Sequence, residues 1–459
     1  MSRVERLDGA DTVTHRRVLA IAVPMTLAYL STPILGIVDT TVIGRLGSAS
    51  LLGGIAVGAI IFNVLFTSFN FLRSGTTGLT AQALGANDRL EIRACLYRAL
   101  LIAVVSGVAL IVLAEPFLAT GLAFMNASPA VNAATSEYFM IRILSSPFAL
   151  ANYAILGWFI GLGRAGTGLA LQVLLNGLNI ALNIWFVMGL GWGIAGVAWG
   201  TALGEAITAM VGLWLAYRQM GPGQRPAISA ILDKVRFLKL LALNGDIMIR
   251  SFSLVFAFAY FASRGAEQGD VILGANAVLM NFFLAASFFL DGFATAAEQL
   301  AGKTIGARRP QAFRTAVSLT LLWGFCLAGF ASAVFWFTGP LAINLMTTNE
   351  EVRATAHVFL IWAALTPLSG VLAFQFDGVF IGATWSNDMR NMMLIALAAF
   401  LASVHLLMPA LGNHGLWAAL HVFLLTRGIT LTLRYPVRLR AFSEKVGAGL
   451  TTGKRDENI

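Results

Sequence analysis

The stretch ACLYRALLIAVVSGVALIVLAE, residues 94–115, decides the fold of this chain. It holds one basic and one acidic residue, Arg98 and Glu115, in a run that is otherwise uncharged. A helix needs roughly 20 apolar residues to cross the hydrocarbon core of a bilayer. The stretch therefore predicts a transmembrane helix.

The composition of the whole chain supports this interpretation. Of 459 residues, 58% are hydrophobic and 12% are charged, whereas soluble domains carry about 25% charged residues. So few charged residues cannot cover the surface of a water-soluble globule, so a soluble globular protein is excluded. The two cysteines, Cys95 and Cys326, lie far apart in apolar stretches. We expect two small buried side chains there, without a disulfide or a metal cluster.

Apolar segments of the same kind recur along the chain, and one long polar insert, residues 217–237, divides them into two sets of six. We expect an all-α membrane protein with twelve transmembrane helices in two six-helix bundles. The N-terminal lobe covers residues 1–222, a cytoplasmic linker covers 223–236, and the C-terminal lobe with a basic cytoplasmic tail covers 237–459. The predicted spans are residues 17–41, 51–83, 94–115, 133–161, 166–190, 193–217, 237–263, 271–302, 313–337, 355–382, 389–410 and 414–435.

The basic residues predict the orientation of these spans. On one side of the membrane the termini and loops hold 24 of the 31 Lys and Arg, and the other side holds Arg45, Arg264 and Arg353. Cytoplasmic loops carry the excess of Lys and Arg. Both termini are therefore predicted to be cytoplasmic, in a multi-pass protein of a bacterial inner membrane. Topology accounts for the net charge of +9, and we expect no nucleic-acid partner.

The two halves of the sequence resemble each other. GTTGLTAQALGAND, residues 75–88, aligns with TAAEQLAGKTIGARR, which ends at 309, and GWFIGLG, residues 157–163, aligns with GVFIGAT, residues 378–384. The separation is 221 residues in both, as Gly85 with Gly306 and Gly161 with Gly382 show. An offset of six spans places both repeats in the same orientation, which predicts a pseudo-two-fold axis along the membrane normal. Two similar bundles are typical of alternating-access carriers.

Several of these segments resemble the multidrug and toxic compound extrusion (MATE) transporters, most closely the DNA-damage-inducible F (DinF) branch. The resemblance extends from about Arg17 to Tyr435, and it implies export of organic compounds in exchange for protons or sodium ions. It implies small organic substrates and the lipid bilayer as partners, a monomer, and neither enzymatic activity nor a cofactor. The segments that carry it are PILGIVDTTVIGRLG (33–47), LNIALNIWFVMGLG (178–191), LDGFATAAEQLAGKTIGA (290–307) and DGVFIGAT (377–384).

Asp39 is the first candidate for the coupling site. A charged side chain at the centre of a bilayer costs about 2.5–3.5 kcal/mol on insertion scales, so an intramembrane carboxylate indicates function. Pro24 and Pro33 precede it in the first span and can kink that helix, which would couple protonation to bending. The resemblance implies the same role, because the family's protonation site is the Asp at this place.

Three amides of the fifth span, Asn176, Asn179 and Asn183, are spaced i, i+3 and i+7 and share one helix face. The resemblance places Asn179 and Asn183 at the family's cation-handling positions, where the second residue is often Asp. An amide there favours coupling to protons over sodium. We expect further cavity residues in the neighbouring spans at Asn152, Thr201 and Glu205.

The C-terminal half offers Asp377 as a second proton or cation site, because no basic residue lies within four positions of it. Arg73 falls, by the repeat offset, between Asp291 and Glu298 in depth, and it could pair with one of them to lock a cytoplasmic gate. The five histidines form no i, i+4 pair, so neither a metal site nor catalytic residues are expected. No Walker loop is present, so an ion gradient or a separate subunit must supply the energy. A sodium-coupled antiporter and a lipid-linked sugar flippase stay open as alternatives.

Overall fold

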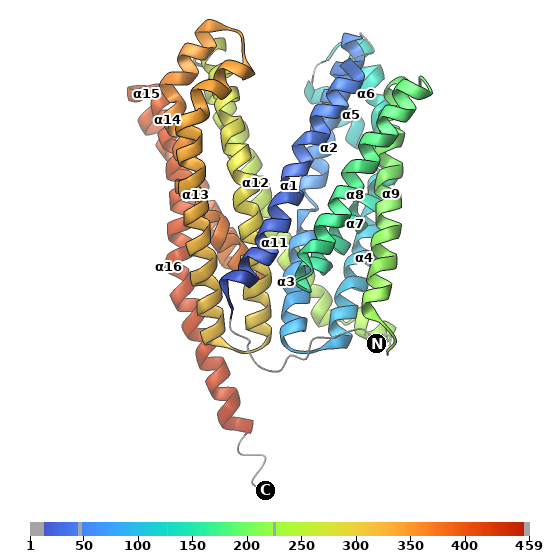
Figure 1. The fold of residues 1–459 in the computed structure, drawn as a ribbon, viewed down its shortest axis with the longest axis vertical. Helices are drawn as coiled ribbons and strands as arrows, with labels where there is room; N and C mark the ends of the chain where they lie inside the picture. Colours follow the sequence, from blue (N-terminus) through green and yellow to red (C-terminus); the bar gives the residue numbers. More distant parts are fainter. Residues whose placement is uncertain (1–12, 45–47, 126, 224–225, 454–459) are drawn as a thin grey trace. The chain divides into compact units, whose positions relative to one another are not determined.

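The structure is a computed structural model that describes residues 13–44, 48–125, 127–223 and 226–453, apart from a few side chains inside helices. All regular elements of these residues are helices (Figure 1). In the first half they are α1 (His15–Gly44), α2 (Ala49–Thr67), α3 (Asn70–Gly85), α4 (Arg89–Val112), α5 (Ala114–Met125), α6 (Pro129–Arg142), η1 (Ile143–Ser145), α7 (Ser146–Gly161), α8 (Ala165–Ile184), η2 (Trp185–Gly189) and α9 (Gly193–Met220).

A four-residue helix, α10 (Ile228–Ile231), lies in the predicted linker. The second half follows as six long helices: α11 (Lys234–Ala266), α12 (Asp270–Gly306), α13 (Pro310–Met346), α14 (Glu350–Gly382), α15 (Ser386–Leu411) and α16 (Asn413–Gly453).

The helices have the length and composition of membrane spans. Among the described residues, eleven helical segments are long and apolar enough to cross a bilayer. Three of these segments join α2 to α3, α6 to α7, and α8 to η2. With α1, whose 30 residues extend about 45 Å at 1.5 Å per residue, they form twelve rods at the places of the predicted spans.

The repeat offset holds for the ends of the helices. α3 ends at Gly85 and α12 at Gly306, and α7 ends at Gly161 and α14 at Gly382, so both pairs are 221 residues apart. The turns repeat too, since residues with positive φ form three pairs at the same offset: Asn87 with Arg308, Gly163 with Thr384, and Gly191 with Gly412. The internal duplication predicted from the sequence is confirmed in the backbone.

Glycines give both repeats the same helix packing. An added Cβ on Gly157 of α7 would lie 2.3 Å from the carbonyl oxygen of Arg73 in α3. The repeat partner, Gly378 of α14, would lie 2.1 Å from that of Ala294 in α12. Both glycines open a G-x-x-x-G motif, and small residues at this spacing let two helices approach closely inside a membrane.

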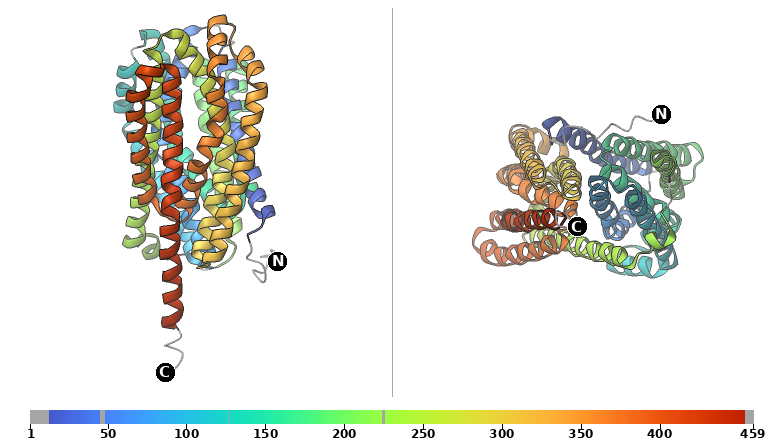
Figure 2. Two further views of the ribbon diagram at one scale, coloured as in Figure 1. Left: turned by 90° about the vertical axis from the view of Figure 1, so that its left-hand side faces the viewer. Right: turned by 90° about the horizontal axis from the view of Figure 1, so that it is seen from below.

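The chain divides into two compact units. Unit 1 comprises Met1–Thr26, Ala81–Asn87 and Ser253–Ile459, and unit 2 comprises Leu27–Thr80 and Asp88–Phe252. Within unit 1, α16 continues beyond the ends of its neighbours as one helix (Figure 2). These two units divide the chain at other positions than the predicted lobe boundaries, residues 222 and 237. The lobe boundaries therefore stay a prediction.

Of the two thiols, Cys95 is buried as predicted. The prediction is wrong for Cys326, which is exposed on α13 near the exposed side chains of Leu322 and Phe325. The physical reason is that an apolar face of a membrane helix can face lipid as readily as protein.

Candidate functional site

The amide stripe predicted in the fifth span lies on α8, and all three of its members are buried. The side-chain amide of Asn183 donates a hydrogen bond to Oδ1 of Asn179 over 2.7 Å. Asn179 in turn donates to the hydroxyl of Thr201 on α9 over 2.9 Å. The structure thus brings three of the predicted site residues into one hydrogen-bonded chain.

Glycines on α9 make room for this chain. An added Cβ on Gly200 would lie 2.0 Å from Oδ1 of Asn183, and one on Gly204 would lie 3.4 Å from the backbone nitrogen of Asn179. Only a residue without a side chain fits at the first position. The motif G-x-x-x-G on α9 is therefore part of the site, although sequence analysis did not single it out.

The third amide ties α8 to α1. Asn176 donates to the hydroxyl of Ser31 over 2.7 Å and accepts from Gln172 over 3.2 Å. Ser31 was missed, and its place two residues before Pro33 gives no signal, because its partner lies 145 residues away in the sequence.

The side chain of Asp39 lies outside the described residues. Its backbone belongs to α1, eight residues beyond Ser31. The role of Asp39 in coupling stays a prediction.

Glu205 of α9 has one hydrogen-bonding neighbour that was predicted from the sequence, Asn152, and one that was not, Ser145. The hydroxyl of Ser145 donates to its carboxylate over 2.5 Å, and the side-chain amide of Asn152 donates to its backbone carbonyl over 2.9 Å. Arg142 attracts the same carboxylate electrostatically. This guanidinium stacks 4.5 Å above the ring of Phe62 and donates to a tyrosine hydroxyl over 2.7 Å. Ser145 and Arg142 thus join the site with Glu205.

Asp377 has a basic partner after all. Arg427 of α16 forms a buried ion pair with its carboxylate, and the two side chains are 3% and 6% exposed. The search for a partner within four positions missed it because 50 residues separate the two in the sequence. A role for Asp377 in coupling stays a prediction, and the pair gives it a structural role that sequence analysis did not foresee.

The predicted gate pair is distributed over both units. Arg73, in unit 2, donates to the hydroxyl of Tyr29 over 3.0 Å and to that of Ser74 over 3.2 Å. Asp291 and Glu298 lie on α12 in unit 1. A bridge from Arg73 to either acid stays a prediction.

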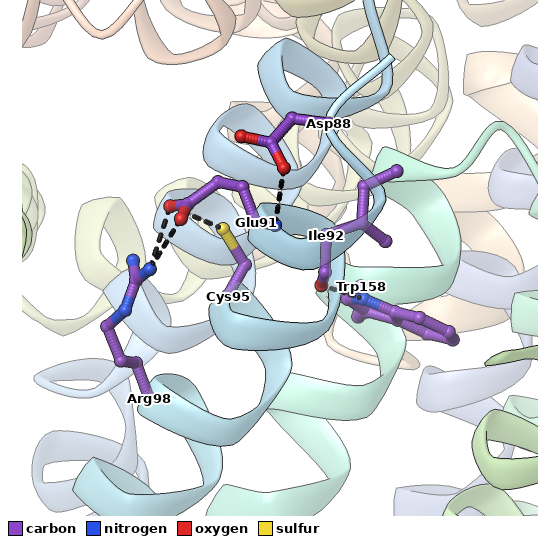
Figure 3. Close-up of polar contacts among 6 residues, drawn as sticks. All are labelled: Asp88, Glu91, Ile92, Cys95, Arg98 and Trp158. Carbon is purple, nitrogen blue, oxygen red and sulfur yellow. Dashed lines mark hydrogen bonds and ion pairs between the residues drawn. The ribbon is translucent and has the colours of Figure 1, made fainter. Parts of the chain in front are cut away.

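A further polar cluster lies at the start of α4 (Figure 3). Asp88 caps the helix by accepting from the backbone N–H of Glu91 over 2.9 Å. The carboxylate of Glu91 pairs with Arg98 over 2.7 Å and accepts from the thiol of Cys95 over 3.6 Å. Arg98 is 1% exposed. The ion pair with Glu91 explains how Arg98 is accommodated inside the apolar stretch of residues 94–115.

The described residues contain no group of three or more His, Cys, Asp or Glu side chains placed to hold a metal ion. The polar groups around the α8 amides and Glu205 are amides, hydroxyls, the Glu205 carboxylate and the Arg142 guanidinium. Such a set can exchange hydrogen bonds with a proton-carrying carboxylate or a polar ligand.

The MatE family model matches the chain twice, at residues 24–185 and 247–407. Together the matches cover more than half of the chain, and one falls on each sequence repeat. The chain belongs to the MatE family. The resemblance drawn from its motifs is thereby confirmed.

Relatives of this MatE chain extend over almost its whole length. It is 38% identical to DNA damage-inducible protein F of Escherichia coli, over 92% of both chains. It is 27% identical to protein DETOXIFICATION 44, chloroplastic, of Arabidopsis thaliana, over 89% of this chain and 80% of that one. A probable multidrug resistance protein NorM of Chromobacterium violaceum is 23% identical, over 94% and 95% of the two chains.

Solved structures share the fold of this MatE chain. An outward-facing multidrug resistance MATE transporter of the MOP superfamily superposes with a TM-score of 0.82, covering 94% of this chain and 97% of that one at 18% identity. A MOP superfamily transporter from Pyrococcus furiosus gives 0.83 over 93% and 96% at the same identity. The all-α membrane fold predicted from the sequence is confirmed, and the chain is a multi-pass MATE transporter.

Proposed function

We propose that this transporter exports organic compounds by alternating access in antiport with protons, and that Asp39 carries the coupled proton. The observation that carries the proposal is the buried chain from Asn183 through Asn179 to Thr201. A hydrogen bond from Asn176, on the same helix α8, to Ser31 ties α8 to the helix of Asp39. A proton site needs partners for both of its protonation states. Amides supply a donor for the ionised carboxylate and an acceptor for the protonated one.

The registers of α1 and α8 support a common depth for Asp39 and Asn183. Successive spans reverse direction, so the first and fifth run parallel. At 1.5 Å per residue, the Cα of Asp39 lies about 12 Å beyond Ser31 along α1, and that of Asn183 lies about 10 Å beyond Asn176 along α8. Because Ser31 and Asn176 are hydrogen-bonded, these distances bring the Cα atoms of Asp39 and Asn183 to nearly the same depth along the two helices.

Protons are favoured over sodium by the chemistry of the partners. Hard cations prefer carboxylate oxygens as ligands. The side chains joined along α8 and α9 are two amides and a hydroxyl, and Asn183 is an amide where the family often has an acid.

The substrate cavity is proposed along Asn152, Asn176, Thr201 and Glu205. The carboxylate of Glu205, which accepts a hydrogen bond from Ser145, would attract organic cations. A lipid-linked sugar flippase would need arginines ready to bind a pyrophosphate. Three of the arginines within spans instead have protein partners: Arg73, Arg142 and Arg427.

The test is transport by Asp39→Asn in proteoliposomes, with a panel of cationic dyes and amphipathic anions under imposed gradients. The isostere cannot titrate but keeps the volume, so we expect gradient-driven export to be lost while folding and dye binding persist. Asp88→Asn is the matched control, because it makes the same change at an exposed helix cap and Asn caps a helix about as well as Asp. It should transport normally. Full, gradient-dependent export by Asp39→Asn would refute the coupling role.

The same vesicles decide the coupling ion. With the unaltered chain, a pH gradient alone should drive export, and a sodium gradient alone should not. The opposite result would establish the sodium-coupled alternative.

A further inference from the structure

A buried histidine lies between α14 and α16 in unit 1. His421 belongs to the span predicted at residues 414–435, and its side chain is 9% exposed. Its Nε2 lies 3.0 Å from the backbone carbonyl oxygen of Trp362, and its Nδ1 lies 2.9 Å from the hydroxyl oxygen of Ser369, both on α14. Ionisable side chains inside membrane spans are rare and mark ion or substrate pathways. The amide site on α8 lies in unit 2 and does not use this one.

Both protonation states of His421 find hydrogen bonds in this place. The carbonyl of Trp362 can only accept, so Nε2 carries a hydrogen in either state. In the neutral ring, Nδ1 accepts the hydrogen of the Ser369 hydroxyl. In the charged ring, Nδ1 donates to that oxygen, and the hydroxyl turns its hydrogen to the carbonyl of Thr366, 3.1 Å away. The imidazole can therefore gain or lose a proton without leaving either ring nitrogen unpartnered.

A second imidazole beside the same tryptophan differs in this respect. His414, seven residues earlier on α16, is exposed, and its Nδ1 accepts from the indole Nε1–H of Trp362 over 2.9 Å. An indole N–H can only donate, so a proton added at Nδ1 of His414 would break that bond. The ring of Trp362 lies 6.3 Å from that of His414 and 5.4 Å from that of His421. His414 is therefore a matched control for His421.

The charge of a proton on His421 is held by hydrogen bonds to α14. Among the described residues, its polar partners are Ser369 and Trp362, and no carboxylate pairs with it. Asp377 of α14 and Arg427 of α16 pair with each other. The other charged or titratable groups on the surrounding helices of unit 1 are Glu350, Glu351, Arg353 and His357 of α14, Asp388, Arg390 and His405 of α15, Arg434 and Arg438 of α16, Tyr260, Arg264 of α11, and Asp270, Asp291, Glu298 and Lys303 of α12.

The internal repeat relates His421 to the amide site of unit 2. At the offset of 221 residues, His421 corresponds to Gly200 of α9, and Val404 of α15 corresponds to Asn183 of α8. In unit 2, Gly200 leaves the space that the amide of Asn183 fills. In unit 1, the polar side chain stands on the other helix of the pair, and Val404 is apolar and 2% exposed. The helix pair that corresponds to α8 and α9 thus carries an ionisable group of its own.

The helix that holds the imidazole has a proline at this level. Pro367 lies inside α14 and cannot donate to the carbonyl of Ala363, which accepts from the hydroxyl of Thr366 over 2.7 Å instead. Residues 364–366 correspond, at the repeat offset, to Ile143–Ser145, which form the 3-10 helix η1. Prolines and 3-10 turns inside a helix are places where it bends. A proton on His421 therefore changes hydrogen bonds at a place where α14 can bend.

We propose that His421 is a proton-binding site of unit 1, and that its proton is carried in the transport cycle together with that of Asp39. The second statement rests on the proposed antiport function, whereas proton binding does not. The ordinary pKa of histidine, about 6.5, lies within the physiological range. Nδ1 takes up the proton while the Ser369 hydroxyl turns to the carbonyl of Thr366, and release of the proton reverses both changes.

Proton binding is measured on the purified full chain in detergent by nitrogen-15 NMR of labelled histidine side chains, from about pH 4.5 to 8.5. The signals of His421 are those lost in His421→Gln and kept in His414→Gln. They should show the Nε2–H tautomer at high pH and the doubly protonated ring at low pH. A ring that stays neutral throughout, or that carries its hydrogen on Nδ1 at high pH, would overturn the proposal.

Transport of that proton is measured by the charge moved in each cycle. Export of a monovalent cationic dye in exchange for one proton moves no net charge, and exchange for two protons moves one. In proteoliposomes at equal pH on both sides, a potassium diffusion potential should therefore drive dye transport by the unaltered chain and by His414→Gln. It should not drive transport by His421→Gln, which should still respond to a pH gradient.

Glutamine suits this test because its amide can donate to the carbonyl of Trp362 and accept from Ser369, which keeps α14 and α16 joined. Equal responses of His421→Gln and the unaltered chain to the membrane potential would show that this proton is not carried. Full export by Asp39→Asn would refute coupling through Asp39 and leave the NMR titration of His421 unchanged, so the two proposals fail separately.

Discussion

Asp377 and Arg427 show how a buried charge is accommodated at the scale of single residues. Their side chains are 6% and 3% exposed, so neither charge has access to bulk water. Removing one member of such a pair leaves the other charge buried and uncompensated, which costs about 3–5 kcal/mol, whereas replacing both by apolar groups is often nearly neutral.

We therefore expect Asp377→Leu and Arg427→Met each to lower the free energy of unfolding by a few kcal/mol. The double variant should recover most of that loss. Thermal unfolding in detergent checks this, and transport by the double variant separates the two roles of Asp377. Normal gradient-driven export would assign Asp377 a structural role alone, whereas a stable but inactive double variant would support its predicted part in coupling.

At the scale of elements, the two repeats pack their helices by the same small contacts. Gly157 and Gly378 bring α7 and α14 against the backbones of α3 and α12, with no space for a methyl group. Small-to-large changes at such contacts force backbone shifts that cost about 1–3 kcal/mol.

Gly157→Ala and Gly378→Ala should each destabilise the protein by that amount. Gly329→Ala on α13 is the matched control, because an added Cβ there meets nothing within 4 Å. It should be neutral or stabilising by about 0.5–1 kcal/mol, the helix propensity that Ala gains over Gly. Unfolding temperatures of the three variants compare them directly, and equal losses in all three would contradict the packing argument.

At the scale of the whole molecule, the charge distribution predicts the orientation in the membrane. Basic residues concentrate at the termini and in alternate loops, which indicates that both termini are cytoplasmic.

Fusions to a reporter pair test that orientation. Green fluorescent protein should fluoresce, and alkaline phosphatase should be inactive, when either is joined after Met220, between the sixth and seventh predicted spans. After Met125, at the end of α5, the phosphatase should be active and the fluorescence absent. The reverse pattern at both sites would show that the termini face the other side.

The sequence by itself determined the class of the fold, because a spanning helix is a local property of about 20 residues in lipid. The duplication, the ends of α7 and α14, and the common face of the α8 amides follow from an offset and a helical period that the sequence carries directly. The family could be recognised from the sequence for a similar reason, because each of its motifs is one contiguous stretch of the chain.

Only the tertiary structure decided which side chains meet. Ser31 with Asn176, Ser145 with Glu205, and Arg427 with Asp377 are 145, 60 and 50 residues apart. No periodicity within one helix specifies such partners. They depend on how closely two helices approach and at what register, which glycines such as Gly200 set by the space they leave.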